Sequence, residues 1–422
     1  MKDVLTIIMA GGKGTRLLPL TEDRSKPAVP FGGIYRLIDI PLSNCINSQL
    51  YKILIFPQYK SQSLVDHLDE GWNIFSSDLG HHLRIVAPQQ RTGEVWYRGT
   101  ADCVRQNLYL IEREMPRYVL ILSGDHVYKM DYTAFRDYHE KVDADVTVGL
   151  LEVDRSQGSD FGIAEVDNDF RIRSWAEKPK DPKPIPDDPE RCLASMGIYL
   201  FRADLLVDLL HKTDYDDFGA DIIPRLIDKL KIYAYPYRRL NRIRDYIHQT
   251  DPDGVRKLEL VEATRDSQYW RDVGTLDSYW NANMDLTGVE PFFNLYGTLW
   301  PIRTRQCQYP PAKFVFNHPD SRVGTAVDSL VSSGCIVSGG TVRSSVLSCG
   351  VMVRSWAEVD ESVIMDNVEV GRHCKIKKAI IDKHNVIPPY TEIGINPLSD
   401  REKFTVTPRG IVVVPKGYFK PN

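Results

Sequence analysis

A glycine-rich loop follows the first apolar run of the chain, in the stretch IIMAGGKGTRLLPLTEDRSKPAVPFGG at residues 7–33. Glycine lets main-chain N–H groups approach an anion closely because it has no Cβ. The stretch lacks the GxxxxGK[ST] pattern of a Walker A loop, and Leu17 stands where GxGxxG requires its third glycine. Arg16 offers a planar fork for phosphate oxygens, and Lys26 adds a compact positive charge. The pattern predicts a triphosphate site, with a plain tight turn as the alternative.

A second candidate for the ligand site is the acidic residue Asp125, which follows another apolar run. Asp125 follows the apolar run 118–122, so we expect it at the carboxyl end of a strand, where ligands bind in open α/β sheets. The alternative is a turn-forming aspartate, since Gly-Asp after a strand is common turn chemistry. The residues predicted to hold the triphosphate are Gly11, Gly12, Gly14, Thr15, Arg16 and Lys26.

The overall composition is that of a globular protein. The chain has 422 residues, of which 42% are hydrophobic and 26% charged, enough for two domains with sizeable cores. Its net charge of −4 provides no global basic field, so we expect no nucleic-acid partner. We find no signal-peptide pattern and no apolar run long enough to cross a bilayer, and expect no membrane association. Seven scattered cysteines without CxxC spacing favour reduced thiols in a cytoplasmic protein over disulfides or a zinc site.

Short apolar runs alternate with amphipathic stretches in the first two-thirds of the chain. This alternation predicts a parallel sheet covered by helices on both faces. From about residue 144 the runs lie closer together, which predicts antiparallel strands beside the parallel ones. The predicted parallel strands are 4–9, 51–57, 83–88 and 118–123, the later strands are 144–153, 161–167 and 195–201, and the helices are 61–70 and 101–114.

Aliphatic residues recur every seventeen positions in the last hundred residues. Three such columns predict a parallel β-helix with hexapeptide-like repeats, with an antiparallel sheet as the alternative. Residues 287–312 are rich in proline and glycine without a period, which predicts a linker. We therefore expect a catalytic domain at 1–286, a linker at 287–312 and a β-helix domain at 313–422, used for oligomerisation and regulation. The columns are Ile336, Val353, Val370 and Ile387; Val342, Val359, Ile376 and Ile393; and Val346, Val363 and Ile380.

Motifs along the chain resemble those of the sugar-phosphate nucleotidyltransferases. The stretch AGGKGTRLLPLTEDRSKPAVPFGG is similar to the N-terminal signature of that family. Further motifs resemble its glucose-1-phosphate adenylyltransferase branch, also called ADP-glucose pyrophosphorylase. They are RLIDIPLSNCINS, WYRGTAD, GDHVYKMDY, EKP, SMGIY and DFGADIIP, and the resemblance covers nearly the whole chain. It implies an α/β fold with a Rossmann-like nucleotidyltransferase domain, whose sheet is mixed and mostly parallel, followed by a left-handed parallel β-helix.

The reaction of this branch joins ATP and α-D-glucose 1-phosphate to give ADP-glucose and diphosphate, the committed step of glycogen or related α-glucan synthesis. The attacking phosphate is already an anion, so the enzyme must mainly position two anions and neutralise charge. The resemblance implies Mg²⁺ held by Asp125 and Asp272, although a helix N-cap or surface acid is the alternative for Asp272. Arg16, Lys26 and Asp125 would be the catalytic residues. Gln89 would contact adenine, but one glutamine does not distinguish adenine from uracil or thymine.

The resemblance also implies a glucose 1-phosphate site. Lys178 would meet the sugar's phosphate, whereas taken alone it is more often a solvated lysine. Glu177, Ser195 and the main chain of Gly162 would hydrogen-bond sugar hydroxyls. Tyr97 would line the pocket, with a purely structural tyrosine as the alternative.

Enzymes of this branch are typically tetramers that phosphorylated metabolites activate and that AMP, ADP or phosphate inhibit. The resemblance therefore implies a homotetramer with cationic effector sites, for which Arg24, Arg36 and Arg372 are the candidates. Arg372 lies in a basic stretch with Lys375, Lys377 and Lys378, and for these residues the alternative is a solvated basic face. Some relatives carry a basic or aromatic residue where this chain has Pro30, which leaves the identity of the effector open.

Three other functions compete with this interpretation. A sibling nucleotidyltransferase would use UTP, dTTP or GTP. A regulatory subunit without catalysis would be expected to lack Asp125, Lys26 or Lys178, and all three are present. A β-helix acyltransferase would use a histidine base such as His373 or His384, but the phosphate-binding residues upstream argue against it.

Overall fold

The parallel half of the central sheet is built from the predicted apolar runs. In the computed structural model, which describes residues 1–88, 96–318 and 321–420, four neighbouring strands lie in the order β5–β4–β1–β6 and all pair in parallel. They are β1 (Val4–Ala10), β4 (Lys52–Pro57), β5 (His82–Ile85) and β6 (Tyr118–Ser123). The runs are apolar almost throughout because most of these side chains are buried on one face of the sheet or the other.

Antiparallel strands continue the sheet beyond β6, as the closer spacing of the later runs predicts. The long strand β11 pairs antiparallel with β6, β8 and β9, while β12 pairs in parallel with β8. A bulge interrupts β11 between Ser195 and Ile198. These strands are β8 (Val146–Asp154), β9 (Gly162–Val166), β10 (Ile172–Glu177), β11 (Arg191–Arg202) and β12 (Ile232–Pro236).

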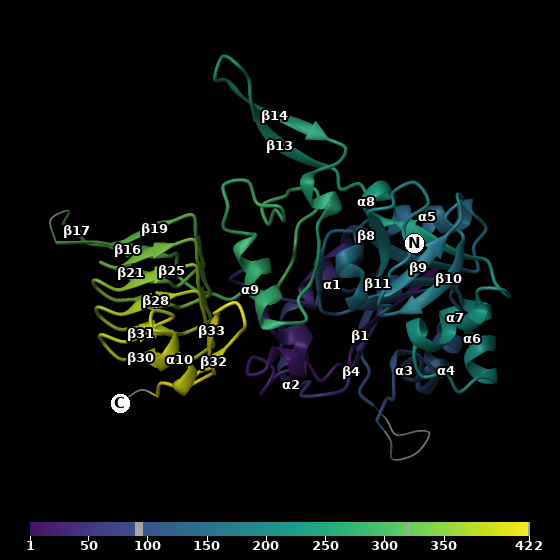
Figure 1. Cartoon of the computed structure of the whole chain (residues 1–422), viewed down its shortest axis with the longest axis horizontal. Coiled ribbons are helices and arrows are strands. Elements are labelled where there is room, and N and C mark those ends of the chain that lie inside the picture. The colour runs from purple at the N-terminus through teal and green to yellow at the C-terminus, as the bar shows by residue number, and fades with distance from the viewer. Residues whose placement is uncertain (89–95, 319–320, 421–422) are drawn as a thin grey trace.

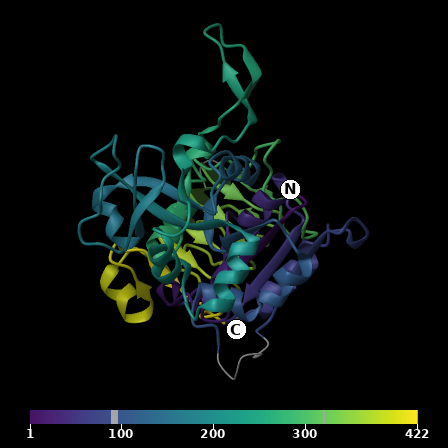
Figure 2. The same ribbon diagram turned by 90° about the vertical axis from the view of Figure 1, so that its right-hand side faces the viewer.

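Helices cover both faces of this sheet (Figures 1 and 2). Alternate residues of β1 enter different cores, with Ile8 on the face covered by α1, α2 and α5, and Ile7 on the face covered by α3, α4 and α6. The helices are α1 (Asp39–Asn47), α2 (Gln62–Gly71), α3 (Thr100–Gln106), α4 (Leu108–Glu114), α5 (Tyr132–Lys141), α6 (Ala203–Lys212), α7 (Ile223–Leu226), α8 (Tyr237–Leu240), α9 (Leu276–Met284) and α10 (Pro397–Lys403).

The helix predicted over 101–114 is divided in two at Asn107, so the prediction of one continuous helix is wrong. The Asn107 side chain donates hydrogen bonds to the Cys103 carbonyl at 2.9 Å and to the Tyr97 hydroxyl at 3.0 Å. Asparagine side chains compete with the helix for main-chain partners, which accounts for the break.

A short strand pair joins two distant parts of the chain. Strand β7 (His126–Tyr128) pairs antiparallel with β15 (Trp270–Asp272), so that Asp272 lies opposite His126. Helix α9 follows directly, and Thr275 and Ser278 form a capping box at its start. The other separate hairpins are β2 (Pro30–Phe31) with β3 (Tyr35–Arg36), β13 (Asp245–Thr250) with β14 (Arg256–Val261), and β17 (Asn317–His318) with β18 (Arg322–Val323).

Three sheets of short parallel strands form the faces of a β-helix in the C-terminal part (Figure 1). Within the described strands of these three sheets, β32 alone pairs antiparallel, with β33. The first face holds β16 (Lys313–Val315), β21 (Ile336–Ser338), β24 (Met352–Val353), β27 (Glu369–Val370) and β30 (Val386–Ile387). The second holds β19 (Thr325–Val327), β22 (Thr341–Arg343), β25 (Glu358–Asp360), β28 (Lys375–Lys377) and β31 (Glu392–Ile393). The third holds β20 (Leu330–Val331), β23 (Val346–Leu347), β26 (Val363–Ile364), β29 (Ala379–Ile381), β33 (Val412–Val414) and β32 (Thr405–Val406).

The second and third predicted columns pair as expected, whereas the first is wrong by one residue at its start. Ile336 pairs with Met352, and Val337 rather than Ile336 pairs with Val353. The reason is that the turn at this point is one residue shorter than those that follow, as the steps from Thr325 to Thr341 and onward show.

The third column does not fill the β-helix but faces the α/β domain. Val363 and Ile380 are buried in the same apolar cluster as Tyr279 of α9, whereas the next residue along, such as Ile364, lies in the interior of the β-helix. Polar contacts reinforce this interface, because the indole N–H of Trp280 donates to the Glu361 carbonyl at 2.8 Å.

Residues 287–312 contain neither helix nor strand, and they pack against α1. The indole N–H of Trp300 donates to Oδ1 of Asn44 at 2.9 Å, and the Thr304 hydroxyl donates to the Asp39 carboxylate at 2.6 Å. The three domain boundaries given above stay a prediction.

Candidate active site

The glycine-rich loop lies at the carboxyl end of β1 and leads into the short 3₁₀ helix η1 (Thr15–Leu17). Gly14 has φ of 64°, and a Cβ there would lie 2.9 Å from Cγ2 of Thr21. The Thr21 hydroxyl holds the turn by donating to the Gly14 carbonyl at 2.8 Å. A Cβ on Gly12 would have no atom within 4 Å, so the loop is open to a ligand at that residue.

Three charged side chains meet beside this loop. The ammonium nitrogen of Lys26, which begins the 3₁₀ helix η2 (Lys26–Ala28), lies 2.7 Å from Oδ2 of Asp125 and 3.3 Å from Oδ1 of Asp272. Strand pairing explains this meeting, because β6 and β1 end at the same edge of the sheet and β15 pairs with the strand that follows Asp125.

The charges of this cluster stabilise one another. Burial by itself would lower the pKa of Lys26, but the negative charges of Asp125 and Asp272 raise it above its usual range. Burial by itself would raise the pKa of Asp125, but the positive charges of Lys26 and His126 lower it well below its usual range. Both groups are therefore charged at neutral pH.

Arg16 reaches the same cluster from the loop. A Cβ added to Gly274 would lie 3.0 Å from Nη2 of Arg16 and 2.8 Å from Oδ2 of Asp272, so the guanidinium and the carboxylate flank one glycine. Arg16 as a whole is an exposed residue. The structure thus brings together Arg16, Lys26, Asp125 and Asp272 from the residues that the sequence predicts.

His126 belongs to this cluster and was missed by the sequence analysis. Its Nε2 lies 3.5 Å from Oδ1 of Asp125 and 3.9 Å from Oδ1 of Asp272, and its ring stands edge-on to Trp270 with centroids 5.0 Å apart. Ser123 also donates to Oδ1 of Asp125. The only signal in the sequence is the adjacency of His126 and Ser123 to Asp125 in SGDH.

The predicted sugar-binding residues form a second group. Gly162 and Glu177 pair across β9 and β10, and a Cβ on Gly162 would lie 2.8 Å from Oε2 of Glu177. Burial raises the pKa of Glu177; the Lys178 charge opposes this effect and the Asp217 charge adds to it. Lys178 is exposed, has φ of 48°, and donates its main-chain N–H to the Phe161 carbonyl at 3.0 Å.

Ser195 connects the two groups. It lies at the bulge of β11, where its hydroxyl accepts the N–H of Gly197 at 3.2 Å. A Cβ on Gly197 would lie 3.8 Å from both His126 and Ser123, so this turn adjoins the carboxylate cluster. Phe161 and His126 both contact Trp270, which links the Lys178 loop to the same cluster.

Tyr97 lies beside the glycine-rich loop rather than in the carboxylate cluster. The Gln58 amide donates to the Tyr97 carbonyl at 3.3 Å, and a Cβ on Gly11 would lie 3.1 Å from Oε1 of the same glutamine. Tyr97 is 9% exposed and its hydroxyl accepts a hydrogen bond from Asn107, and its place in a ligand pocket stays a prediction. Burial raises the pKa of Tyr97 to about 12. Gln89 lies outside the described residues.

The candidate effector residues occupy different surroundings. Arg24 is 5% exposed and forms an ion pair with Oδ1 of Asp382 in the β-helix at 3.0 Å. Arg36 donates to the Ser63 carbonyl at 2.6 Å, and burial lowers its pKa. Arg372 is exposed on the β-helix. The ring of His373, which an acyltransferase would need as a base, is stacked between those of Trp356 and Tyr390.

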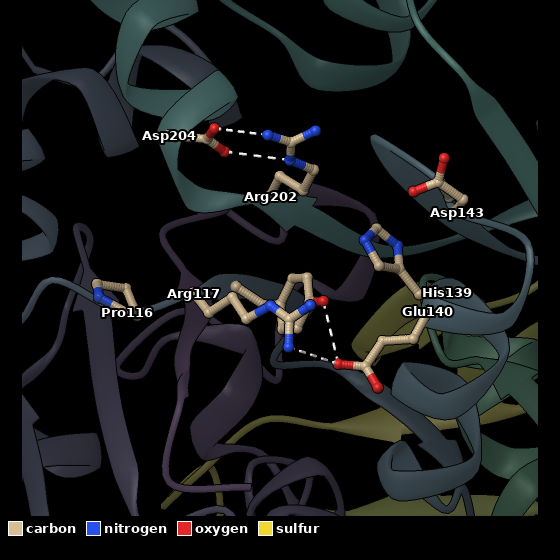
Figure 3. A pocket seen from close by; sticks show the side chains of 9 residues that line it. Pro116, Arg117, His139, Glu140, Asp143, Arg202 and Asp204 are labelled. Carbon is tan, nitrogen blue, oxygen red and sulfur yellow. Dashed lines mark hydrogen bonds and ion pairs between the residues drawn. The ribbon is translucent and has the colours of Figure 1, made fainter.

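A hollow of about 460 Å³ lies at the opposite end of β6, far along the strand from Asp125 (Figure 3). Its charged side chains are paired with one another: Arg117 with Glu140 at 3.2 Å, and Arg202 with Asp204 at 2.7 Å. It has no part in the cluster around Lys26. Within the described ranges, no three His, Cys, Asp or Glu side chains converge as a preformed metal cage, and no helix is long and apolar enough to cross a membrane.

Comparisons with known proteins place this chain in a family. The model of the Nucleotidyl transferase family matches residues 5–288, and that of the GlmU-like C-terminal hexapeptide family matches residues 310–414. The chain is 48% identical to a glucose-1-phosphate adenylyltransferase of Rhodopirellula baltica, over 99% of this chain and 91% of the relative. It is 49% identical to that of Koribacter versatilis, over 99% and 96% of the two chains. The chain belongs to the glucose-1-phosphate adenylyltransferase family. A third member of this adenylyltransferase family, from Vibrio cholerae, is 45% identical over 99% of both chains.

Membership of the adenylyltransferase family confirms the fold class and the type of enzyme expected from the sequence. The chain is a nucleotidyltransferase with a mixed, mostly parallel sheet, followed by a hexapeptide β-helix. The roles of the individual site residues stay predictions.

Proposed function

We propose that the chain transfers the adenylyl group of ATP to α-D-glucose 1-phosphate, forming ADP-glucose and diphosphate for glycogen or related α-glucan synthesis. Similarity over the full length to proteins named for this activity supports the proposal. The observation that carries it is the cluster in which Lys26 contacts both Asp125 and Asp272 beside an open glycine loop.

In the proposed reaction an oxygen of the sugar phosphate attacks the α-phosphorus of ATP. The new P–O bond forms as the bond from the α-phosphorus to the oxygen that bridges to the β-phosphorus breaks, and diphosphate leaves with that electron pair. The main-chain N–H groups of the loop from Gly11 to Thr15 hold the triphosphate, while Arg16 and Lys26 neutralise charge on the leaving group. Lys26 stays a cation at neutral pH although it is buried, because Asp125 and Asp272 more than offset the effect of burial on its pKa.

Two carboxylates facing the same space fit Mg²⁺, which in such sites binds to one or two carboxylates together with substrate phosphates. Asp125 and Asp272 would hold it, and the absence of a third acidic ligand in the described ranges agrees with a site that substrate phosphates complete. When bound, Mg²⁺ supplies Lewis-acid stabilisation of charge on the phosphoryl oxygens.

The acceptor sugar is proposed to bind between β9, β10 and the bulge of β11. Glu177 and the main chain of Gly162 would take sugar hydroxyls together with Ser195, and Lys178 would meet the phosphate. The adjacency of the Ser195 turn to His126 supports this placement, because it sets the sugar beside the carboxylate cluster.

We also propose that phosphorylated metabolites act at the boundary between the two domains of a cytoplasmic homotetramer. The pKa of Lys383 in the β-helix is lowered by burial, despite its ion pair with Asp366, and the charges of Arg36 and Arg24 lower it further. An anion bound among these three cations would relieve their repulsion.

A substrate panel tests the proposed reaction. Purified protein with Mg²⁺ and glucose 1-phosphate is given ATP, UTP, dTTP or GTP in turn, and diphosphate release is measured with and without sugar phosphates as effectors. We expect a strong preference for ATP. A preference for UTP or dTTP would assign a sibling activity instead, and silence with all four nucleotides would favour a regulatory subunit.

A further inference from the structure

The hairpin of β13 and β14 projects away from the body of the protein, and both views show it standing clear of the two domains (Figures 1 and 2). In the part of the chain that the structure describes, these strands pair only with each other. Both strands carry exposed side chains, and every residue from 252 to 259 is exposed. An isolated two-stranded hairpin is at most marginally stable in water, so this arm lacks the support that sheets normally have.

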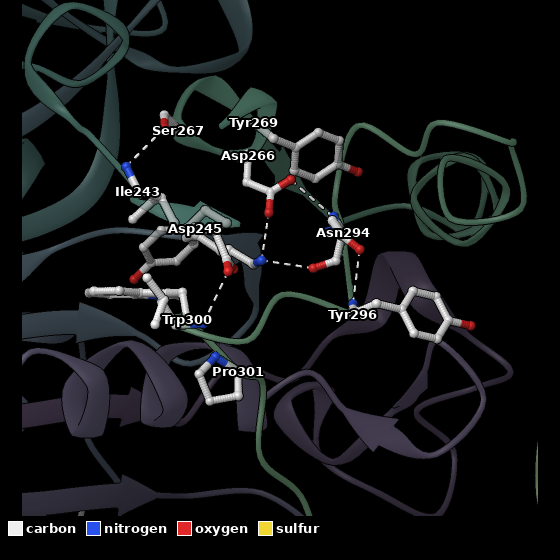
Figure 4. A network of polar contacts seen from close by, with 12 residues as sticks. Ile243, Asp245, Asp266, Ser267, Tyr269, Asn294, Tyr296, Trp300 and Pro301 are labelled. Atoms are coloured by element: carbon white, nitrogen blue, oxygen red, sulfur yellow. Dashed lines mark hydrogen bonds and ion pairs between the residues drawn. The ribbon is translucent and has the colours of Figure 1, made fainter. Parts of the chain in front are cut away.

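The base of the arm is firmly held, in contrast to its blade (Figure 4). Asp245 is 3% exposed, and its Oδ1 accepts main-chain N–H groups of Tyr246 at 2.8 Å, Thr298 at 3.0 Å and Leu299 at 3.1 Å. The N–H of Ile243 donates to the Ser267 hydroxyl at 2.9 Å. These hydrogen bonds fix the direction in which the arm projects from the rest of the protein.

One face of the blade is apolar and open. Tyr246 pairs with Leu260 and His248 with Leu258 across the two strands, which puts these four side chains on the same face. Tyr246 is 42% exposed and Leu258 is 59% exposed. Exposed apolar side chains on a free strand edge form a template for another strand.

The hydrogen-bond pattern shows which main-chain groups are free on the outer edge of β14. At the tip of the hairpin the N–H of Asp251 donates to the Val255 carbonyl at 3.0 Å. Main-chain groups of successive residues point to opposite edges of a strand, so those of Lys257 and Glu259 point to β13. Those of Arg256, Leu258 and Leu260 point outward.

We infer that β14 pairs antiparallel with β14 of a second copy of this chain, about a two-fold axis at Leu258. In this register the outward groups of Leu258 bond to those of its counterpart, and Arg256 bonds to the partner subunit's Leu260. Lys257 then lies opposite the partner subunit's Glu259, and Glu259 opposite the partner subunit's Lys257. A two-fold interface repeats each such pair, so two opposite-charge contacts and one central leucine contact form together.

The neighbouring registers are poorer. An axis at Arg256 would put two arginines opposite each other, and an axis at Leu260 would put Glu259 opposite Val261. An axis at Lys257 or Glu259 would still let the outward main-chain groups of the neighbouring residues bond, but it would put two lysines or two glutamates directly opposite each other. Charge therefore selects the axis at Leu258, in an argument independent of the proposed reaction.

A cysteine at the axis tests this pairing directly in the full chain. Leu258→Cys is made in a Cys307→Ser background, since Cys307 is the exposed cysteine of the native chain. Thr250→Cys, exposed on β13 of the same arm, is the matched control. Under mild oxidation at low protein concentration, we expect covalent dimer to form at least about tenfold faster at Leu258 than at Thr250, because pairing gives the two sulfurs a high effective concentration. Equal rates at the two positions would overturn the inference.

Charge exchange tests the register. Adding Lys257→Glu to Leu258→Cys puts like charges opposite each other, and we expect the crosslinking rate to fall to that of the Thr250 control. Adding Glu259→Lys as well restores opposite charges, and we expect the rate to recover. A rate that is unaffected by the single change, or that the second change does not restore, would rule out this register. Far-UV circular dichroism equal to that of the native chain ensures that each variant is folded.

Discussion

The ammonium nitrogen of Lys26 lies 2.7 Å from Oδ2 of Asp125, in an ion pair that links the loop after β1 to the loop after β6. Asp272 joins the pair from 246 residues further along the chain than Lys26. Lys26 thereby holds the two carboxylates close together, and its charge keeps the pKa of Asp125 below its usual range. The same arrangement leaves Arg16 and Lys26 beside the open glycine loop, where phosphates would enter.

The depressed pKa of Asp125 gives stability a defined pH dependence. Because its folded pKa lies below the unfolded value of 3.8, ionised Asp125 stabilises the protein above that pH, and this contribution is lost as the pH falls toward the folded pKa. We expect the native chain to be more stable than Asp125→Asn at pH 7, and the difference to shrink below pH of about 3.8. Urea unfolding across this range measures it, and a difference independent of pH would contradict the assigned ion pair.

The ion pair between Arg24 and Asp382 connects the two domains, and breaking it should be costly. Both side chains are almost fully buried. We expect Arg24→Met alone to destabilise the protein by about 3–5 kcal/mol, because it leaves the Asp382 carboxylate without its partner in the interior. The double variant Arg24→Met/Asp382→Leu should recover most of this loss. Thermal unfolding of the native chain and the two variants measures these differences, and a single variant as stable as the native chain would refute the structural role.

Gly99 lets two loops approach closely beside the proposed sugar site. A Cβ there would lie 2.3 Å from the Asp216 carbonyl oxygen, and the adjacent Asp217 contributes to the electrostatic environment of Glu177. We expect Gly99→Ala to cost about 1–3 kcal/mol of stability and to raise KM for glucose 1-phosphate more than that for ATP. Gly288→Ala, where a Cβ meets no atom within 4 Å, is the control and should change neither quantity.

The interior column of the β-helix supports its stacked turns. Ile376 is 1% exposed and pairs with Val359 of the turn before it. We expect Ile376→Ala to cost about 2–5 kcal/mol through the cavity it leaves. Val327→Ala on the same face is the control, because that side chain is 56% exposed and should lose little. Comparable losses at the two positions would argue against the interior assignment.

Apolar periodicity was sufficient to predict most of the fold. The strands β1, β4 and β6 are buried on both faces, so their sequences are continuous apolar runs. In the β-helix, aliphatic residues recur once in each turn, so the sequence repeat has the length of a turn. Periodicity could not show that one turn is a residue short, which shifts Val337 into the place expected for Ile336. Nor could it show that Val363 is covered by α9 rather than by the next face of the β-helix, because burial leaves the same pattern in both cases.

Local sequence patterns predict part of the candidate site, whereas Asp272 is predicted only through the resemblance to the family. Asp125 and Lys26 follow a strand and a glycine loop, which is a local pattern. The closeness of Asp272 and His126 depends on the pairing of β7 with β15, which joins residues far apart in the chain. For the same reason the sequence presented Arg24 as a free cation, whereas its carboxylate partner lies 358 residues away.

The most direct test of the central claim is the rate of diphosphate release from ATP and glucose 1-phosphate by Asp125→Asn, with saturating Mg²⁺. The exposed residue Asp143, which pairs with Lys231 away from the site, provides the matched control Asp143→Asn. We expect kcat to fall by about 10²–10³-fold or more in Asp125→Asn, because the carboxylate proposed to hold the metal and to orient Lys26 is lost, and to stay near the native value in the control. Near-native kcat in Asp125→Asn would contradict the assignment of this cluster as the active site.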